Sequence, residues 1–149
     1  DRSDAYYVLG QLYRELPGAP VSFGNTDAAV SLGRMAVDLR AKAVQAGTEK
    51  EPNYGFLLQL AKTLWKRNLS ADKRAAGQAK RLAAFQAAKT PVEKGAAFEG
   101  TLSLAATSDR EEARGIVNGI IADLSKLSSR TAGQDDDLKE ARETLAEWK

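Results

Sequence analysis

Apolar residues recur every three or four positions along nearly the whole chain, and this spacing constrains the fold more than any other feature. In an α-helix such spacing places the apolar side chains on one face, whereas a half-buried strand needs strict alternation. Short turns between amphipathic helices bring neighbours together as antiparallel pairs. We therefore predict one all-α domain over 1–149, with seven helices arranged as pairs at about 3–46, 53–89 and 91–130 and a closing helix at about 134–149.

Side chains at the helix ends support these divisions. Ser3 and Ser70 are expected to cap the first and fourth helices, and Pro17 should end the first. Two segments have the spacing of a capping box, Thr90 to Glu93 and Ser108 to Glu111. The fifth helix is expected to run from Pro91 to about Thr107. On the fourth helix, the expected buried side chains are Ala75, Ala79, Leu82 and Ala83.

The chain contains no cysteine and no histidine, and this absence bears on function. Without cysteine there is no disulfide, thiolate metal site or cysteine nucleophile. Without histidine, a Ser-His-Asp triad and a zinc-binding HExxH motif are excluded. We therefore expect no enzyme activity, no cofactor and no metal. No apolar run approaches the ~20 residues that a membrane-spanning helix needs, so no membrane span is expected.

Two segments resemble the two helices of a tetratricopeptide repeat: Tyr6-x-x-Leu9-Gly10-x-x-Tyr13 and Ala29-x-x-x-Gly33-x-x-Ala36. In that family the small residues let the paired helices approach closely. The resemblance implies a short solenoid of stacked pairs, with a concave groove that binds a peptide or protein. The chain is also similar to the periplasmic T-component of TRAP transporters, a likeness that implies a ligand-binding or transport-accessory role.

The resemblance also implies where the groove residues lie. Side chains on the first helix of each pair would line it, and the candidates are Tyr7, Tyr54, Phe56, Lys62 and Trp65. Their alternative role is to fill the core. The loop after the first helix is unusually long and carries Val21 and Phe23, which would form a lid over a ligand or fold back onto the first pair.

A basic segment is the third candidate site. Residues 62–94 hold nine Lys or Arg and two acidic residues, in a chain whose net charge is only +2. Lys73 and Lys80, like Arg74 and Arg81, are seven residues apart, so they are expected on one helix face. This face would bind an anionic partner such as nucleic acid, or would simply be solvated. Aromatic residues that stack on bases are not interleaved there, which favours the solvated face.

Taken together, these features predict a non-catalytic module that binds a protein or peptide. A periplasmic ligand-binding component is the alternative, and nucleic-acid binding is the third. The chain begins with Asp1 rather than Met, which is typical of a processed or excised segment. A removed signal would indicate the periplasm or envelope, and otherwise the cytoplasm is expected.

Overall fold

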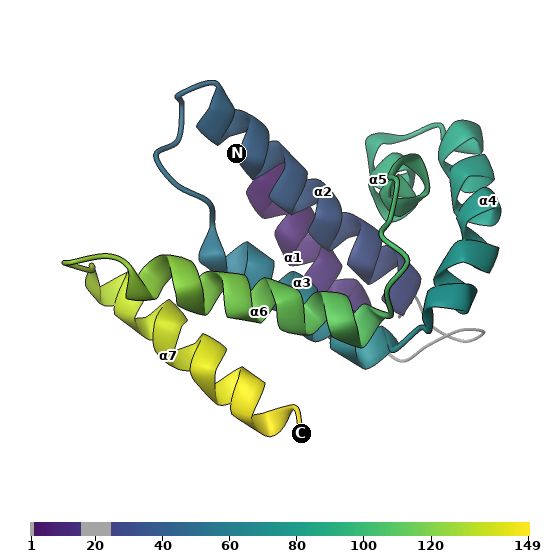
Figure 1. Ribbon diagram of the computed structural model, residues 1–149. Coiled ribbons are helices and arrows are strands. Elements are labelled where there is room, and N and C mark those ends of the chain that lie inside the picture. Colours follow the sequence, from purple (N-terminus) through teal and green to yellow (C-terminus); the bar gives the residue numbers. More distant parts are fainter. Residues whose placement is uncertain (1, 16–24) are drawn as a thin grey trace.

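The computed structural model describes residues 2–15 and 25–149, with side chains described for 3–10 and 25–149. Every regular element within these ranges is helical, which confirms the all-α prediction (Figure 1). The elements, in chain order, are α1 (Arg2–Glu15), α2 (Thr26–Gln45), α3 (Tyr54–Arg67), α4 (Ala71–Ala87), α5 (Pro91–Ala96), the 3-10 helix η1 (Phe98–Thr101), α6 (Asp109–Ser125) and α7 (Ala132–Glu147).

Local side-chain chemistry sets most of these bounds. Both predicted capping boxes are present, and the Ser70 hydroxyl accepts from the backbone N–H of Lys73. A third capping box, between Thr131 and Gln134, begins α7 slightly earlier than expected. One bound differs from the prediction, because α1 begins at Arg2, before the expected cap Ser3, and Ser3 is buried.

The fifth helix is shorter than predicted, because α5 ends at Ala96 and continues as η1 rather than as α-helix to Thr107. The tighter turn buries Glu99, whose backbone N–H donates to the Ser31 hydroxyl. It also brings Gly100 against the backbone of α4. A Cβ at position 100 would lie 2.3 Å from the carbonyl carbon of Arg81. Side-chain burial therefore overrides local helix propensity here.

Small residues let α1 and α2 pack closely, as predicted. A Cβ on Gly10 would lie 3.3 Å from the Cβ of Leu32, and Ala29 and Ala36 are buried beside it. A Cβ on Gly33 would lie 3.3 Å from Cδ1 of Leu60, so α2 also approaches α3 closely. The second helix therefore lies between two close neighbours.

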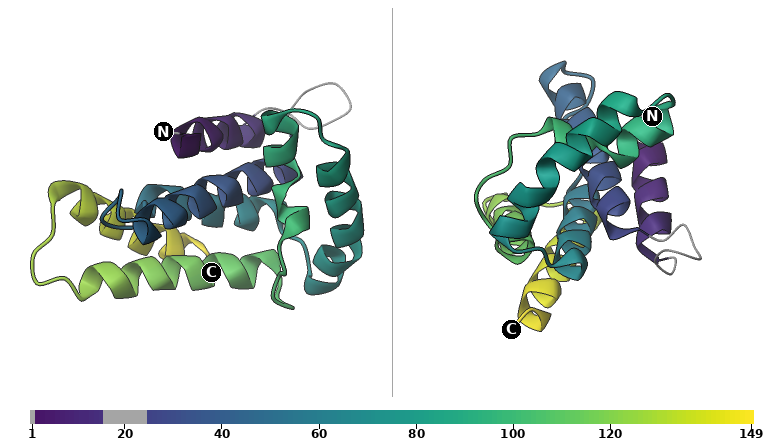
Figure 2. Two further views of the ribbon diagram at one scale, coloured as in Figure 1. Left: turned by 90° about the horizontal axis from the view of Figure 1, so that it is seen from above. Right: turned by 90° about the vertical axis from the view of Figure 1, so that its right-hand side faces the viewer.

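The main apolar core lies between α2, α3, α6 and α7. It comprises Val30, Leu58, Leu60, Ala61, Leu64, Ala113, Val117, Ile120, Leu124, Leu138, Ala141 and Trp148. The third helix packs chiefly on α6 and α2, while α4 packs on η1 and α5. The predicted solenoid of consecutive pairs is therefore not confirmed. Helices α4 and α5 lie at one end of the molecule, and the turn between α6 and α7 lies at the other (Figure 2).

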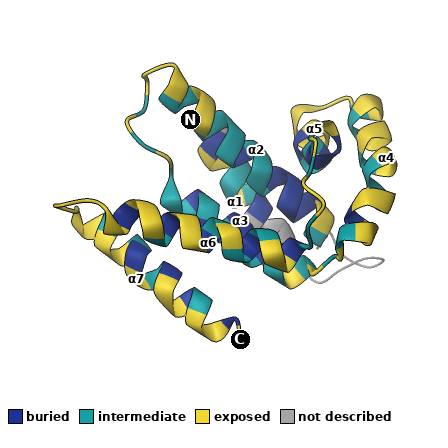
Figure 3. Cartoon of the chain, in the orientation of Figure 1, coloured by how far each residue is buried: buried dark blue, intermediate teal, exposed yellow. Residues whose placement is uncertain are grey.

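The buried face of α4 differs from the prediction. Ala75, Ala79, Leu82 and Ala83 are all exposed, and the buried residue on this helix is Arg74. Figure 3 shows most of α4 as exposed. The inward face of α4 meets carboxylates of α6 and η1, so a charged side chain is stabilised there and an alanine stripe is not. None of the described helices has the length and hydropathy that a membrane crossing requires.

Candidate binding site

The structure places the predicted groove residues in separate environments. The rings of Tyr7 and Phe56 stack with their centroids 4.7 Å apart, and Phe56 is only 5% exposed. This pair fills the space between α1 and α3. Val21 and Phe23, the predicted lid residues, lie outside the described residues.

Trp65 belongs to a second aromatic cluster. Its ring stacks on Trp148 with centroids 4.4 Å apart and an interplanar angle of 1°. The guanidinium groups of Arg110 and Arg114 lie 4.4 and 4.9 Å from the Trp65 ring centroid, within cation–π range. Trp65 therefore joins α3 to α6 and α7. The ammonium group of Lys62 pairs with Glu140 of α7 and also joins these helices.

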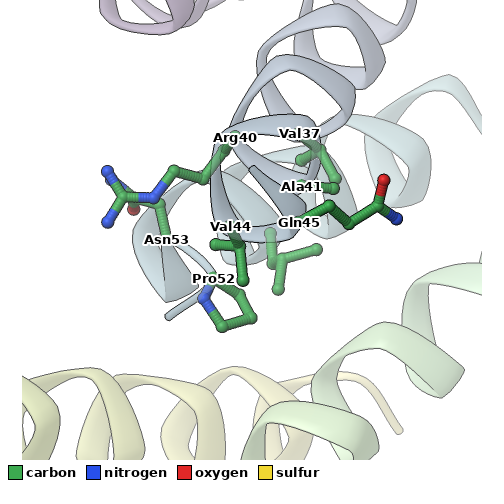
Figure 4. Close-up of a pocket in the computed structure, with 8 residues that line it drawn as sticks. Val37, Arg40, Ala41, Val44, Gln45, Pro52 and Asn53 are labelled. Carbon is green, nitrogen blue, oxygen red and sulfur yellow. The ribbon is translucent and has the colours of Figure 1, made fainter. Parts of the chain in front are cut away.

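An apolar pocket of about 340 Å³ lies where the end of α2 faces the start of α3. Its lining residues are Val37, Arg40, Ala41, Val44, Gln45, Pro52, Asn53 and Leu57. Those from α2 are spaced by three or four residues and thus share one face. In Figure 4, Val44 points toward Pro52, while Arg40 and Gln45 extend to opposite sides. The volume is at the lower end of the range for ligand pockets.

A second, more polar hollow of about 210 Å³ adjoins the apolar pocket and shares Arg40, Pro52 and Asn53 with it. Its remaining lining residues are Glu51, Tyr54, Thr131, Gly133, Gln134 and Asp137. The fifth predicted groove residue, Tyr54, is therefore placed at a cavity. We treat the two neighbouring hollows together as one candidate site, which spans the α2–α3 turn and the start of α7.

Hydrogen bonds hold the walls of this site in place. Nε of Arg40 donates to the backbone oxygen of Glu51 at 3.1 Å, and its Nη1 lies 2.9 Å from Oε1 of Glu49. Nε2 of Gln134 donates to Oε2 of Glu51 at 2.8 Å. The Asn53 side chain accepts from the backbone N–H of Phe56 and begins α3. The turn that separates the two hollows is thus fixed from both sides.

The electrostatic environment of the polar hollow is negative. Burial raises the pKa of the Tyr54 hydroxyl, and three nearby carboxylates add to this effect: Asp123, Glu51 and Asp137. Burial also raises the pKa of Asp137, with further contributions from other acidic side chains of α7 and from Glu51. Asp137 has no ion-pair partner among the described residues. Arg40 is the one basic lining residue, and Glu49 already neutralises it.

Sequence reasoning missed most of the apolar pocket, although α2 carries a signal for it. Val30, Val37 and Val44 recur every seven residues beside the stripe that faces α1. Val30 is fully buried in the core, whereas Val37 and Val44 are half-buried. This row of valines thus extends beyond the part of α2 that other helices cover, and Val37 and Val44 line the pocket.

The predicted basic face divides into an exposed half and a buried half. Lys73 and Lys80 are exposed, while Arg74 is 1% exposed and Arg81 is largely covered. The two arginines enter a buried ion-pair cluster. Its basic members are Arg34, Arg67, Arg74 and Arg81, and its acidic members are Asp27, Glu99, Asp109 and Glu112.

The carboxylates of this cluster are bound by guanidinium groups. Glu99 accepts from Nε of Arg34 at 2.6 Å and from Nη1 of Arg67 at 2.8 Å, and it is fully buried. Arg67 also binds both oxygens of Asp109. Burial opposes ionisation of Glu112, but hydrogen bonds and charges from Arg34 and Arg74 outweigh it and lower the pKa of Glu112. Glu112 is therefore held as a structural anion, which disfavours an acid–base role for it.

No group of three or more acidic residues among the described residues could hold a metal ion. Comparison with known proteins finds no match among family models, curated proteins or solved structures. The resemblances to tetratricopeptide repeats and to the T-component therefore stay predictions.

Proposed function

We propose that this chain is a non-catalytic interaction module that binds a segment of a partner protein at the α2–α3 turn. The observation that carries the proposal is the apolar pocket, whose half-buried valines extend from the core stripe of α2. Such a pocket gains stability when an apolar side chain replaces water.

The proposed occupant is a peptide with one aliphatic or aromatic anchor followed by Lys or Arg. The pocket volume of about 340 Å³ suits a single side chain, as do the anchor pockets of many interfaces. The adjoining hollow presents the carboxylates of Glu51 and Asp137, and Asp137 lacks a cationic partner among the described residues. A basic side chain beside the anchor would complement this charge.

The buried ion-pair cluster disfavours the nucleic-acid alternative. Arg74 and Arg81 are engaged with acids of the chain itself, so Lys73 and Lys80 are what remains of the four-residue basic face. Each phosphate contact needs an available cation, and two lysines support few contacts.

NMR titration of the chain with a short Gly/Ser peptide carrying Leu-Lys-Lys tests the proposal. We expect shift changes confined to the ends of α2 and α3 and the start of α7. One buried Leu contributes about 1.5–3 kcal/mol, so the Kd should be weak, on the order of 10 mM. A peptide with Ala in place of Leu should not bind, and one with Leu-Glu-Glu should bind more weakly than Leu-Lys-Lys.

Two variants distinguish the pocket from a nonspecific surface. Ala41 is exposed and lines the pocket, so Ala41→Phe should fill it and abolish the shifts. Ala46 is exposed at the end of α2 and does not line the pocket, so Ala46→Phe should bind like the unmodified chain. Equal binding by Ala41→Phe would reject the site.

A further inference from the structure

The chain leaves the helical body after Leu69 and re-enters it at Asp109, and these two residues are hydrogen-bonded to each other. The backbone N–H of Asp109 donates to the oxygen of Leu69, and the N–H of Leu69 donates to Oδ2 of Asp109, each at 2.9 Å. Just before Leu69, Asn68 ends α3 in the left-handed conformation with φ of 55°. The segment, which we call the 70–108 unit, contains α4, α5 and η1 and lies at one end of the molecule (Figure 1).

The 70–108 unit contributes no residue to the main apolar core, whose members come from α2, α3, α6, α7 and the C-terminal Trp148. The sole buried residue of α4 is Arg74. The apolar contact of the unit with the body includes small residues: Gly95 faces Tyr6 and Leu32, and Ala97 is buried. The buried residues of the unit are Arg74, Gly95, Ala97, Glu99 and Gly100, so none of its large apolar side chains is fully buried. Polar groups therefore contribute much of its attachment to the body.

Those polar groups form a latch between the unit and the body. From the unit, Glu99 pairs with Arg34 of α2 and Arg67 of α3. Arg74 pairs with Glu112 of α6 at 2.6 Å, and Arg81 lies 3.4 Å from Asp27 of α2.

The body retains charge pairs of its own, between Arg34 and Glu112 and between Arg67 and Asp109. Loss of the latch therefore leaves the buried charges of the body compensated.

We infer that the 70–108 unit opens and closes against the α2–α3–α6 body as one cooperative piece, with the Glu99, Arg74 and Arg81 ion pairs as its latch. Opening preserves the apolar core and the joint at Leu69 and Asp109. It uncovers the guanidinium groups of Arg34 and Arg67, which Glu99 covers in the closed state. This inference is independent of the peptide-binding proposal, because the apolar pocket contains no residue of the unit.

Native-state hydrogen exchange on the full chain tests the inference. In the unmodified protein, amides of α4 should exchange through an opening that leaves amides of α3 and α6 protected. Glu99→Gln removes the latch charge while keeping the side-chain shape. We expect exchange in α4 to become faster by about 10- to 100-fold, with α3 and α6 unchanged.

Two further variants keep the result interpretable. Arg81→Met breaks a less buried part of the latch and should accelerate the same α4 amides, even if Glu99→Gln fails to fold. Asp72→Asn alters an exposed acid of α4 outside the latch and should leave exchange unchanged. Equal acceleration of α3, α4 and α6 by the latch variants would show a single cooperative unit and overturn the inference. Unchanged exchange in α4 would do the same.

Discussion

The contact between Gly100 and α4 predicts a pair of glycine substitutions with opposite effects. A Cβ at position 100 would lie 2.3 Å from both the carbonyl carbon of Arg81 and the nitrogen of Leu82. These are backbone atoms, so no side-chain rotation relieves the contact, and η1 and α4 must separate by about 1 Å to restore ordinary packing. Overpacking of this kind costs about 1–3 kcal/mol.

Gly115 provides the matched control. It lies in α6, is exposed, and a Cβ there would meet no atom within 4 Å. Gly115→Ala therefore gains helix propensity without a clash, which stabilises by about 0.4–1 kcal/mol. For a chain of this size each kcal/mol moves the melting temperature by roughly 2–4 °C.

Thermal and urea denaturation followed by circular dichroism measure both effects. We expect Gly100→Ala to melt lower by roughly 2–12 °C and Gly115→Ala to melt higher by a few degrees. If Gly100→Ala is as stable as the unmodified chain, η1 does not lie against α4 as described. If both variants lose stability equally, the reasoning from local space is wrong.

Two further predictions concern α7. Because the folded state raises the pKa of Asp137, its ionised form destabilises the fold near neutral pH, and this penalty disappears as pH falls and the carboxylate is protonated. Asp137→Asn should therefore be more stable than the unmodified chain at pH 7 and equally stable near pH 3, as measured by urea denaturation. If Asp137→Asn were less stable than the unmodified chain at pH 7, the raised pKa of Asp137 would be contradicted. Thr131→Ala removes the cap that accepts from the N–H of Gln134, and should cost about 1 kcal/mol in the same assay; no loss would mean that this cap does not stabilise α7.

Local sequence signals predict much of this fold. The capping boxes at Thr90 and Ser108 mark helix starts correctly, because a cap depends on residues only a few positions apart. The three- and four-residue spacing of Leu138, Ala141, Leu145 and Trp148 matches the inward side of α7, where Leu145 is half-buried and the other three are buried. The close approach at Gly10 also follows from residue size alone.

The fourth helix could not be predicted in this way. Arg74 determines which face of α4 points inward, because it binds Glu112, which lies 38 residues further along the sequence. A pattern of apolar residues treats alanine as buried and arginine as exposed, and cannot register a carboxylate brought in by another helix. The apolar pocket was missed for a related reason. It forms where the neighbouring helices stop covering the valines of α2, and the spacing of those valines does not show where that coverage ends.

Intermolecular NOEs between the Leu methyl groups of the Leu-Lys-Lys peptide and methyl groups of the chain locate the bound anchor on the protein. We expect NOEs to Val37, Val44 and Leu57, which belong to the apolar lining of the pocket. NOEs that instead reach the Trp65 and Trp148 cluster, or the exposed alanines of α4, would contradict this expectation.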